Sequence, residues 1–259
     1  MPQDTLKTDQ DVVLISGAAS GIGRAVALKL AGEGARLGLF DLNAEALSEV
    51  VAECGAPDAG IVAICGDVSN DNDVEGAVAR LVNEFGRLSG VVCAAGVALK
   101  GDVTNVTDDV WDRTLAVNLT GTFLMARHAM PRLAECAPSG FVAVSSDAGV
   151  RGSRGYAAYC ASKHGVVGLV RCMALDHGPQ GVRSNVVCPT FVDTPMAQGL
   201  LKDGGRYDRA FYESRIPLGR FARADEVADA ICHLLSPQAS YANGSVYVLD
   251  GGTTAGTFG

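Results

Sequence analysis

The first residues whose types and spacing could perform chemistry are Tyr159 and Lys163, in the segment Tyr159-Cys160-Ala161-Ser162-Lys163. On a helix, residues i and i+4 lie on one face with their Cβ atoms about 5–6 Å apart, which makes phenol and ammonium neighbours. A free tyrosine has a pKa near ~10, too high for a base at neutral pH, and a nearby ammonium favours the phenolate. The pair is therefore a candidate acid–base group, although the same spacing also arises by chance in exposed surface pairs.

A candidate partner hydroxyl precedes this helix. The apolar run Phe141-Val142-Ala143-Val144 leads into Ser145-Ser146. Open α/β sheets bind ligands at the carboxyl ends of their strands, where a serine after such a run would lie. We therefore expect Ser146 to act together with Tyr159 and Lys163.

A glycine-rich turn follows the first apolar run of the chain. It reads Gly17-Ala18-Ala19-Ser20-Gly21-Ile22-Gly23 and leads into a helical pattern. Glycines in such a turn let the backbone approach a pyrophosphate, which then lies at the positive end of the helix. The spacing is GxxxGxG and differs from the usual GxGxxG fingerprint. The turn predicts a dinucleotide site that includes Gly17, Ser20, Gly21, Ile22 and Gly23.

Asp41 ends the second apolar run, 18 residues after Gly23. A carboxylate at this offset accepts hydrogen bonds from the adenosine ribose hydroxyls and repels a 2′-phosphate. No basic residue follows it, and Ser20 stands before Gly21 where a lysine or arginine would favour NADP. The pattern favours NAD, with NADP less suited; the alternative is that Asp41 only caps the next helix. Asp67 could bind the adenine edge, or equally form a turn or helix cap.

Short apolar runs alternate with longer amphipathic stretches along the whole chain, which predicts right-handed βαβ crossovers. Because the runs are continuously apolar, we expect parallel strands covered on both faces. This is a single-domain α/β fold spanning residues 1–259, Rossmann-like and doubly wound, with about seven strands. The expected strands are Val12–Ser16, Leu37–Phe40, Gly60–Ile64, Gly90–Cys93, Phe141–Ser145, Arg183–Val187 and Ser245–Leu249, and the expected helices are Gly23–Glu33, Ala44–Glu53, Asp71–Phe85, Thr107–Leu133, Tyr156–Asp176 and Ala224–Leu235.

One segment interrupts this alternation. Between Pro189 and Arg223 there is no clear helical pattern, and the chain carries Pro195, Asp203-Gly204-Gly205 and Pro217. So long a connection in a compact domain is usually functional, and it contains enough apolar side chains to cover a small ligand. We expect a substrate lid around residues 190–222; the alternative is an ordinary surface excursion.

Composition excludes several classes of partner. A net charge of −8 and a pI near 5.0 argue against nucleic acid and anionic membrane surfaces. The 8 cysteines form no CxxC pair and no metal-ligand cluster with histidine, so we expect no metal. No signal peptide is recognisable at residues 1–10, and no apolar run is long enough to span a membrane, which predicts a cytoplasmic protein.

Together these residues resemble the short-chain dehydrogenase/reductase family across essentially the whole chain. The matching segments are Ser16-Gly17-xxx-Gly21-Ile22-Gly23, Asp67-Val68, Asn118-Leu119-Thr120-Gly121, Ser146, Tyr159-xxx-Lys163 and Asn243-Gly244. The resemblance implies a tetrad in which Tyr159 moves the proton, Ser146 binds the substrate oxygen, Lys163 holds the nicotinamide ribose and lowers the pKa of Tyr159, and Asn118 binds a water. The cofactor contacts that it adds are Asp67, Val68, Ala94, Gly96, Tyr159, Lys163, Pro189, Val192 and Thr194.

Three positions depart from the family pattern. The usual Asn-Asn-Ala-Gly is Cys93-Ala94-Ala95-Gly96, so the asparagine side chains that brace the sheet are absent. Ser16 replaces the usual threonine and keeps a hydroxyl. Thr190 replaces the glycine after Pro189 and adds a side chain near the nicotinamide. None of these departures affects the proton-transfer group.

The sequence identifies the substrate less well than the reaction. Candidate pocket residues are Asp147, Ala148, Arg151, Arg154, Tyr156, Thr190 and Phe191. Arg151 and Arg154 could bind a carboxylate and Asp147 further hydroxyls, but solvated rim charges are the favoured reading of all three. We expect an NAD(H)-dependent dehydrogenase or ketoreductase of a small secondary alcohol. The alternatives are an NADPH-dependent 3-oxoacyl thioester reductase and a non-catalytic NAD-binding regulator; the resemblance also implies a homotetramer or a dimer.

Overall fold

The computed structural model describes residues 11–55, 60–202 and 208–257. Its centre is a 7-stranded parallel sheet in the order β3-β2-β1-β4-β5-β6-β7. The order reverses between β1 and β4, and ligands bind at such a switch point in open α/β sheets. The strands are β1 Val12–Ser16, β2 Arg36–Asp41, β3 Ile61–Cys65, β4 Gly90–Cys93, β5 Ser139–Val144, β6 Val182–Pro189 and β7 Val246–Leu249.

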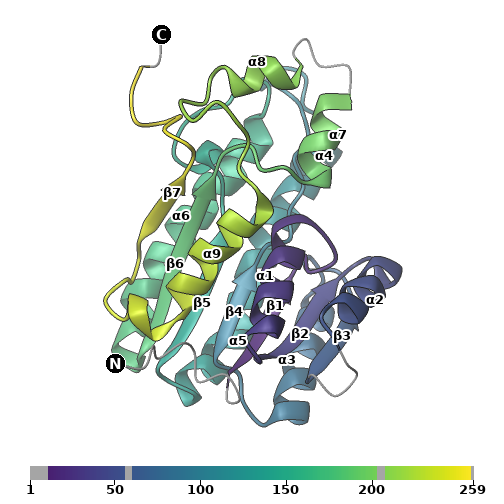
Figure 1. Ribbon diagram of the computed structural model, residues 1–259, viewed down its shortest axis with the longest axis vertical. Coiled ribbons are helices and arrows are strands. Elements are labelled where there is room, and N and C mark those ends of the chain that lie inside the picture. The colour runs from purple at the N-terminus through teal and green to yellow at the C-terminus, as the bar shows by residue number, and fades with distance from the viewer. Residues whose placement is uncertain (1–10, 56–59, 203–207, 258–259) are drawn as a thin grey trace.

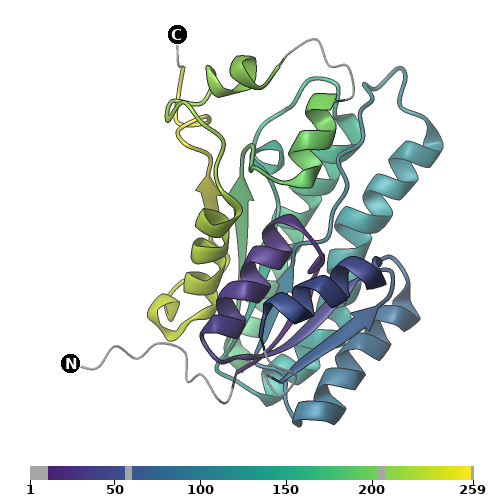
Figure 2. The same cartoon turned by 45° about the vertical axis from the view of Figure 1, so that its right-hand side comes forward.

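Helices cover both faces of the sheet (Figures 1 and 2). One face carries α1 Gly21–Gly32, α2 Ala44–Glu53 and α9 Ala224–Leu235. The other face carries α3 Asp71–Phe85, α5 Gly121–Glu135 and α6 Ala157–His177, with α4 Asp108–Leu115 packed against α6. The central strands β1, β4 and β5 are buried along their whole lengths. The predicted doubly wound α/β fold is therefore confirmed.

The predicted helix over residues 107–133 is wrong in one respect. The structure divides it into α4 and α5, separated by a π-helical turn at Ala116–Thr120 that contains Asn118. π-Helical turns often occur at functional sites because they redirect a side chain out of the regular helical pattern. Here the turn directs the Asn118 side chain into the interior, where only 1% of the residue is exposed.

The expectation of no helix between Pro189 and Arg223 is also wrong. This segment contains α7 Pro195–Lys202 and the short α8 Arg209–Glu213, which lie beyond the ends of the strands in Figures 1 and 2. It has its own apolar cluster of Ala197, Ile216 and Phe221, against which Phe191, Leu201 and Tyr212 pack. The predicted breaker Asp203-Gly204-Gly205 lies outside the described residues, as does the amino-terminal stretch 1–10.

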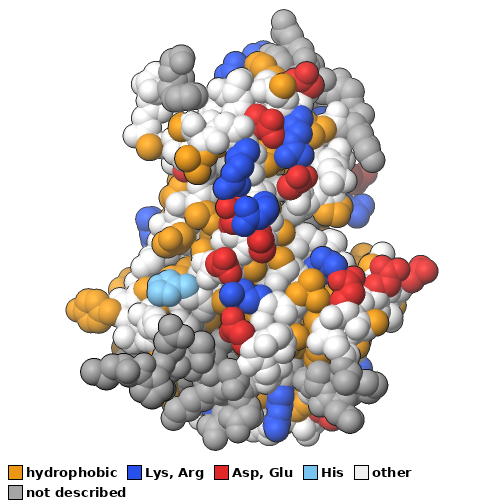
Figure 3. All heavy atoms as spheres, in the orientation of Figure 1, with side chains coloured by type: hydrophobic (Ala, Val, Ile, Leu, Met, Phe, Trp, Pro, Cys, Tyr) orange, Lys and Arg blue, Asp and Glu red, His pale blue; other side chains and the backbone are white. Residues whose placement is uncertain are grey.

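The face that carries α1 and α9 shows acidic and basic side chains interspersed down its middle (Figure 3). Among the ion pairs there are Lys29 with Asp229 on neighbouring helices and Arg220 with Glu226. A nucleic-acid-binding surface would instead gather basic residues on one face. Within the described part of the chain, no helix is long and apolar enough to cross a membrane.

Candidate active site

The carboxyl end of β5 and the first turns of α6 bring Ser146, Tyr159 and Lys163 together, as the sequence predicts. Ser146 follows β5 in extended backbone and is 8% exposed. Its hydroxyl lies near the Tyr159 phenol on α6, close enough to act against the rise of the Tyr159 pKa that burial causes. A substrate oxygen between these two hydroxyls would meet both a proton-transfer group and a hydrogen-bonding group.

Lys163 is buried beneath this pair, with only 5% of the residue exposed. Its ammonium donates a hydrogen bond of 2.9 Å to the carbonyl of Val144, the last residue of β5. In the reverse direction, the Ser145 hydroxyl donates to the carbonyl of Lys163 at 2.9 Å. These two bonds fasten α6 to the end of β5. Burial lowers the pKa of Lys163 to about 8.

Among the protein's own groups, burial raises the pKa of Tyr159 to about 12, and the Asp147 charge acts in the same direction. The lowering of this pKa by Lys163 together with an oxidised nicotinamide stays a prediction. The Lys163 Nζ lies 5.7 Å from the centroid of the Tyr159 ring, and its hydrogen bond goes to Val144. Desolvation therefore outweighs the ammonium, because a phenolate in a buried site loses more hydration than this arrangement returns.

Asn118 connects the loop after β4 to α6. Its Oδ1 accepts from the Val97 amide at 2.8 Å, and its Nδ2 donates to the Val97 carbonyl at 2.9 Å and to Ser162 Oγ at 3.0 Å. Ser162 in turn donates to the carbonyl of Tyr159 at 2.7 Å. Asn118 thus holds the backbone of the catalytic turn of α6.

Asp147 is a buried ionic centre, and the favoured reading of a solvated rim charge is wrong for it. It is 8% exposed and forms an ion pair of 2.6 Å with Arg151. The Ser146 hydroxyl donates to its Oδ1 at 2.9 Å, and the Thr190 hydroxyl donates to its Oδ2 at 3.1 Å. A buried carboxylate needs such partners, because an unpaired charge in this position would be strongly unfavourable.

The other candidate substrate residues are placed differently. The Arg151 side chain is 43% exposed and is bound to Asp147, whereas Arg154 is exposed. Tyr156 precedes α6, and its ring lies edge-on to that of Tyr159 with centroids 6.2 Å apart. Phe191 is stacked on Phe221 at 5.0 Å inside the 190–222 segment, so it supports that segment from within.

The glycine-rich turn lies against the loop after β4. A Cβ on Gly17 would come within 2.6 Å of the Ala95 amide nitrogen, and a Cβ on Gly23 within 2.1 Å of the Gly17 carbonyl oxygen. Glycine is therefore required at both positions. Ser20 is the N-cap of α1 and makes no side-chain hydrogen bond to the amides of the first turn. In contrast, the side-chain oxygens of Asn43 and Asn70 accept from first-turn amides of α2 and α3. The amides at the start of α1 remain available to a phosphate.

Asp41 does not cap the following helix, which Asn43 caps. Instead its Oδ2 accepts from the Ala19 amide at 3.0 Å and its Oδ1 from the Asn43 amide at 3.0 Å, which places the carboxylate beside the glycine-rich turn. Asp67 uses its Oδ1 to accept from the amide and hydroxyl of Ser69, at 2.8 and 2.7 Å. The turn-forming reading of Asp67 therefore has direct geometric support.

The remaining expected cofactor contacts lie around the same edge of the sheet. Ala94 donates its amide to the Ser16 carbonyl at 3.1 Å, and a Cβ on Gly96 would come within 3.5 Å of Lys163 Nζ. Thr194 lies next to Gly21, since a Cβ there would be 3.3 Å from its Cγ2. Pro189 ends β6, Val192 is 6% exposed, and Val68 packs against Gly121.

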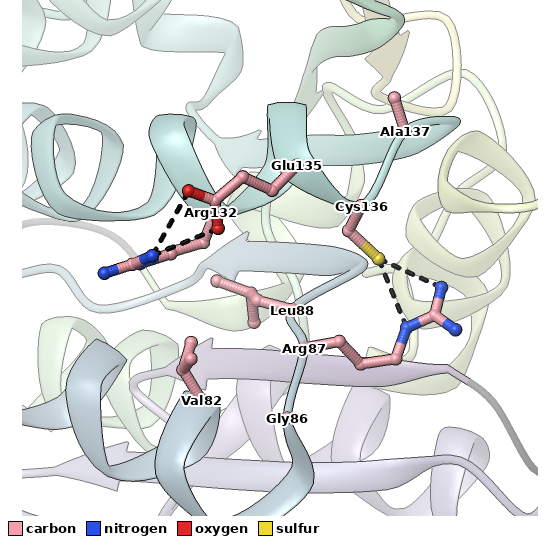
Figure 4. Close-up of a pocket in the computed structure, with 8 residues that line it drawn as sticks. All are labelled: Val82, Gly86, Arg87, Leu88, Arg132, Glu135, Cys136 and Ala137. Carbon is pink, nitrogen blue, oxygen red and sulfur yellow. Dashed lines mark hydrogen bonds and ion pairs between the residues drawn. The ribbon is translucent and has the colours of Figure 1, made fainter.

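A hollow of about 350 Å³ lies at the opposite edge of the sheet (Figure 4). Its lining includes Leu88 and Ala137, which precede β4 and β5, whereas Ser146 follows β5. Within it, Arg87 Nη2 contacts Cys136 Sγ at 3.0 Å. It contains none of the candidate catalytic residues and is a separate feature of the surface.

Three supporting residues escaped the sequence reasoning. Ser145, Ser162 and the Val144 carbonyl position Lys163 and Tyr159, yet each is a common residue in a common setting. Ser162 alone gave a signal, because it stands immediately before Lys163. The pairing of Thr190 with Asp147 joins residues 43 apart and had no local signal.

The chain is similar to known oxidoreductases over nearly its whole length. A family model described as "Enoyl-(Acyl carrier protein) reductase" matches residues 17–254. D-threitol dehydrogenase of Mycolicibacterium smegmatis is 39% identical over 96% of this chain and 94% of its own. Meso-2,3-butanediol dehydrogenase of Serratia marcescens is 37% identical over 96% and 97%. The crystal structure of levodione reductase superimposes with a TM-score of 0.92 at 36% identity, covering 97% of this chain and 100% of that one.

The lowered pKa of Lys163 predicts a pH-dependent stability. Between the folded value of about 8 and the ordinary 10.5, the unfolded chain binds more protons, so this contribution to stability rises with pH. The free energy of unfolding of the parent, relative to Lys163→Met, should increase by about 2 kcal/mol from pH 8 to pH 10. Urea unfolding followed by circular dichroism measures it.

The matched control is Lys29→Met, since the pKa of the surface residue Lys29 is raised. The stability that Lys29 contributes is lost only above about pH 10. The difference in unfolding free energy between the parent and Lys29→Met should therefore not rise between pH 8 and pH 10. A flat or falling difference for Lys163→Met would contradict the burial of its charge.

Proposed function

Because the chain belongs to the short-chain dehydrogenase/reductase family, we propose that it interconverts a secondary alcohol and a ketone with NAD(H), with Tyr159 as general acid and base. The observation that carries the proposal is the convergence of Tyr159 and Ser146 above the buried ammonium of Lys163. Relatives described as dehydrogenases of D-threitol and of meso-2,3-butanediol support the same reaction class.

The residues present fit a dinucleotide. The uncapped start of α1 offers backbone amides to a pyrophosphate, and Gly17 and Gly23 leave no room for side chains in the turn. Asp41 stands beside this turn, where ribose hydroxyls would donate to it. When bound, the nicotinamide supplies the carbon that accepts or returns the hydride and, when oxidised, a positive charge.

Each catalytic residue then has one task. Tyr159 takes the proton of the alcohol hydroxyl, or returns one to the ketone oxygen, while Ser146 donates a hydrogen bond to that same oxygen. Lys163 presents its ammonium near Gly96, where it can hold a ribose hydroxyl. Asn118 keeps the Tyr159 turn of α6 in place through Ser162.

The magnitude of the pKa change shows what Tyr159 requires. Lowering its pKa from about 12 to near neutrality takes roughly 7 kcal/mol, since each pKa unit corresponds to about 1.4 kcal/mol. A single hydrogen bond to a charged group contributes about 1.5–3 kcal/mol. We infer that nearby positive charge provides most of the change, which Lys163 supplies only in part from 5.7 Å.

The 190–222 segment is proposed as the cover of the substrate. At its start, Thr190 donates a hydrogen bond to Asp147. Near its end, Phe221 stacks on Phe191, and the apolar cluster around these two rings holds the described parts of the segment together. The Thr194 side chain lies next to Gly21 of the glycine-rich turn. The segment therefore reaches both this turn and the proposed catalytic residues. Such a segment can exclude water from the reacting atoms.

We also propose a cytoplasmic homotetramer. Trp111 on α4 and Phe123 on α5 are 38% and 40% exposed, and Leu175 on α6 is 78% exposed. Large apolar side chains that remain exposed on these helices would become buried if the helices paired with a second copy.

Replacing Tyr159 by phenylalanine should abolish proton transfer and leave cofactor binding intact. We expect kcat/KM for alcohol oxidation to fall at least about a thousandfold, at the upper end of general acid–base effects. The assay follows absorbance of reduced nicotinamide over a panel of secondary alcohols. Tyr241→Phe is the matched control, expected to stay within about twofold, because Tyr241 is fully exposed and precedes β7, at the end of the sheet away from Tyr159.

The alternatives have distinct outcomes in the same assay. Undiminished turnover by Tyr159→Phe would contradict the proposed mechanism. Binding of NADH without turnover of any alcohol or ketone by the parent chain would favour the non-catalytic regulator. Reduction of a 3-oxoacyl thioester with NADPH, faster than any alcohol reaction, would favour the thioester reductase.

Asp41 should determine the choice between NAD and NADP. In the parent chain we expect kcat/KM to be at least about a hundredfold higher with NAD, because the carboxylate repels a 2′-phosphate. Asp41→Ala should reduce this ratio by about tenfold or more, measured with one alcohol and both cofactors. Equal use of both cofactors by the parent would contradict the role given to Asp41.

A further inference from the structure

The carboxylate of Asp147 is bound unequally at its two oxygens. Oδ2 accepts from Arg151 Nε at 3.2 Å, from Arg151 Nη2 at 2.6 Å and from Thr190 Oγ1 at 3.1 Å. Oδ1 accepts from the Ser146 hydroxyl at 2.9 Å. Among the described residues, Ser146 is the donor that the structure assigns to Oδ1.

Ser146 has one hydroxyl proton, and two acceptors compete for it: Asp147 Oδ1 and the substrate oxygen. In the reaction proposed above, that proton is donated to the oxygen of the substrate. A hydroxyl donates one hydrogen bond at a time, so Oδ1 loses its donor when Ser146 turns to the substrate. Asp147 is 8% exposed, and a buried carboxylate oxygen without a hydrogen-bond donor is unfavourable. A hydroxyl bound beside Ser146 can supply the replacement donor.

We propose that this donor is a second hydroxyl of the substrate, on the carbon next to the reacting carbon. The substrate class is then a vicinal diol, oxidised to an α-hydroxyketone. This inference rests on the proposed function and narrows it. Asp147 acts as a specificity-determining residue that binds the hydroxyl that does not react.

The distances suit adjacent hydroxyls. Ser146 Oγ is 2.9 Å from Oδ1 and would lie at a similar distance from the reacting oxygen. Two partners of one hydroxyl are then about 4–5 Å apart. A hydroxyl on the neighbouring carbon lies between them, within hydrogen-bonding reach of Oδ1. A hydroxyl several carbons away would extend past Asp147.

The charges favour a neutral diol over a hydroxy acid. The guanidinium of Arg151, whose charge could bind a substrate carboxylate, is already bound to Asp147 by two of its nitrogens. A substrate carboxylate in this place would face the Asp147 charge at short range. The pair thus presents an acceptor for hydroxyl groups, held in position by Arg151 and Thr190.

The test compares 2,3-butanediol, each stereoisomer separately, with 2-butanol, which has the same carbon chain without the second hydroxyl. NAD is the cofactor, and kcat/KM is measured for both alcohols. The parent chain should prefer its best diol stereoisomer by at least about a hundredfold, because a site built to bind a hydroxyl discriminates strongly against the analogue that lacks it. Asp147→Ala should reduce this preference at least about tenfold.

A further variant controls for general damage. Cys136→Ser alters the hollow at the opposite edge of the sheet and should change neither rate (Figure 4). Circular dichroism establishes that each variant is folded.

The outcomes distinguish this inference from the function on which it rests. A parent chain that oxidises 2-butanol as well as every diol stereoisomer overturns the inference and leaves the alcohol dehydrogenase intact, whether or not Asp147→Ala folds. A diol preference that Asp147→Ala retains, or faster oxidation of 3-hydroxybutyrate than of any diol, also overturns it. No turnover of any alcohol overturns both.

Discussion

The buried ammonium of Lys163 is the constraint on which the rest of the site depends. A charge in the interior is tolerated only with hydrogen-bonding partners, and here the Val144 carbonyl at the end of β5 provides one. The bond fixes α6 against β5, with Ser145 returning a second bond to the backbone of Lys163. Because Tyr159 lies one helical turn before Lys163, the same fastening places its phenol beside Ser146. Loss of this ammonium would remove one of the two hydrogen bonds that fasten α6 to the end of β5.

Around Tyr159 the chain places charges of both signs. Lys163 lies beneath the ring and Asp147 lies beyond Ser146, and the Asp147 charge together with burial keeps the phenol protonated. Arg151 and Thr190 hold the carboxylate so that its free side is directed to Ser146. The balance makes the phenol a poor base until positive charge comes close to it. In the proposed mechanism, proton transfer would therefore depend on an occupied dinucleotide site.

Much of the fold was predictable from sequence because its signals are local. Ala44–Glu53, Asp71–Phe85 and Ala224–Leu235 were predicted with the bounds that the structure gives, since each has clear helical periodicity. The π-helical turn at Asn118 was hidden, because its residues fit a regular helix equally well. α7 and α8 were missed because Pro195 and the glycines and proline around the two helices suggested an irregular segment.

The site was predictable in its composition and less so in its energetics. Tyr159, Lys163, Ser146 and the glycine-rich turn follow from spacing along the chain. The raised pKa of Tyr159 does not, because desolvation depends on everything packed around the phenol. Asp147 was read as a solvated charge, since its partner Thr190 comes from another strand and only the folded chain joins them. Long-range pairs of this kind leave no periodic pattern in a sequence.

The proposed coupling of Tyr159 to the dinucleotide site can be tested directly through ionisation of the phenol. Ultraviolet absorption of tyrosinate, measured from pH 7 to about 10.5 as the difference between the parent chain and Tyr159→Phe, isolates this residue. Without NAD, we expect no ionisation of Tyr159 in this range, because its pKa is raised to about 12. With saturating NAD, we expect a phenolate signal that develops at least about two pH units lower. Identical titrations with and without NAD would contradict it.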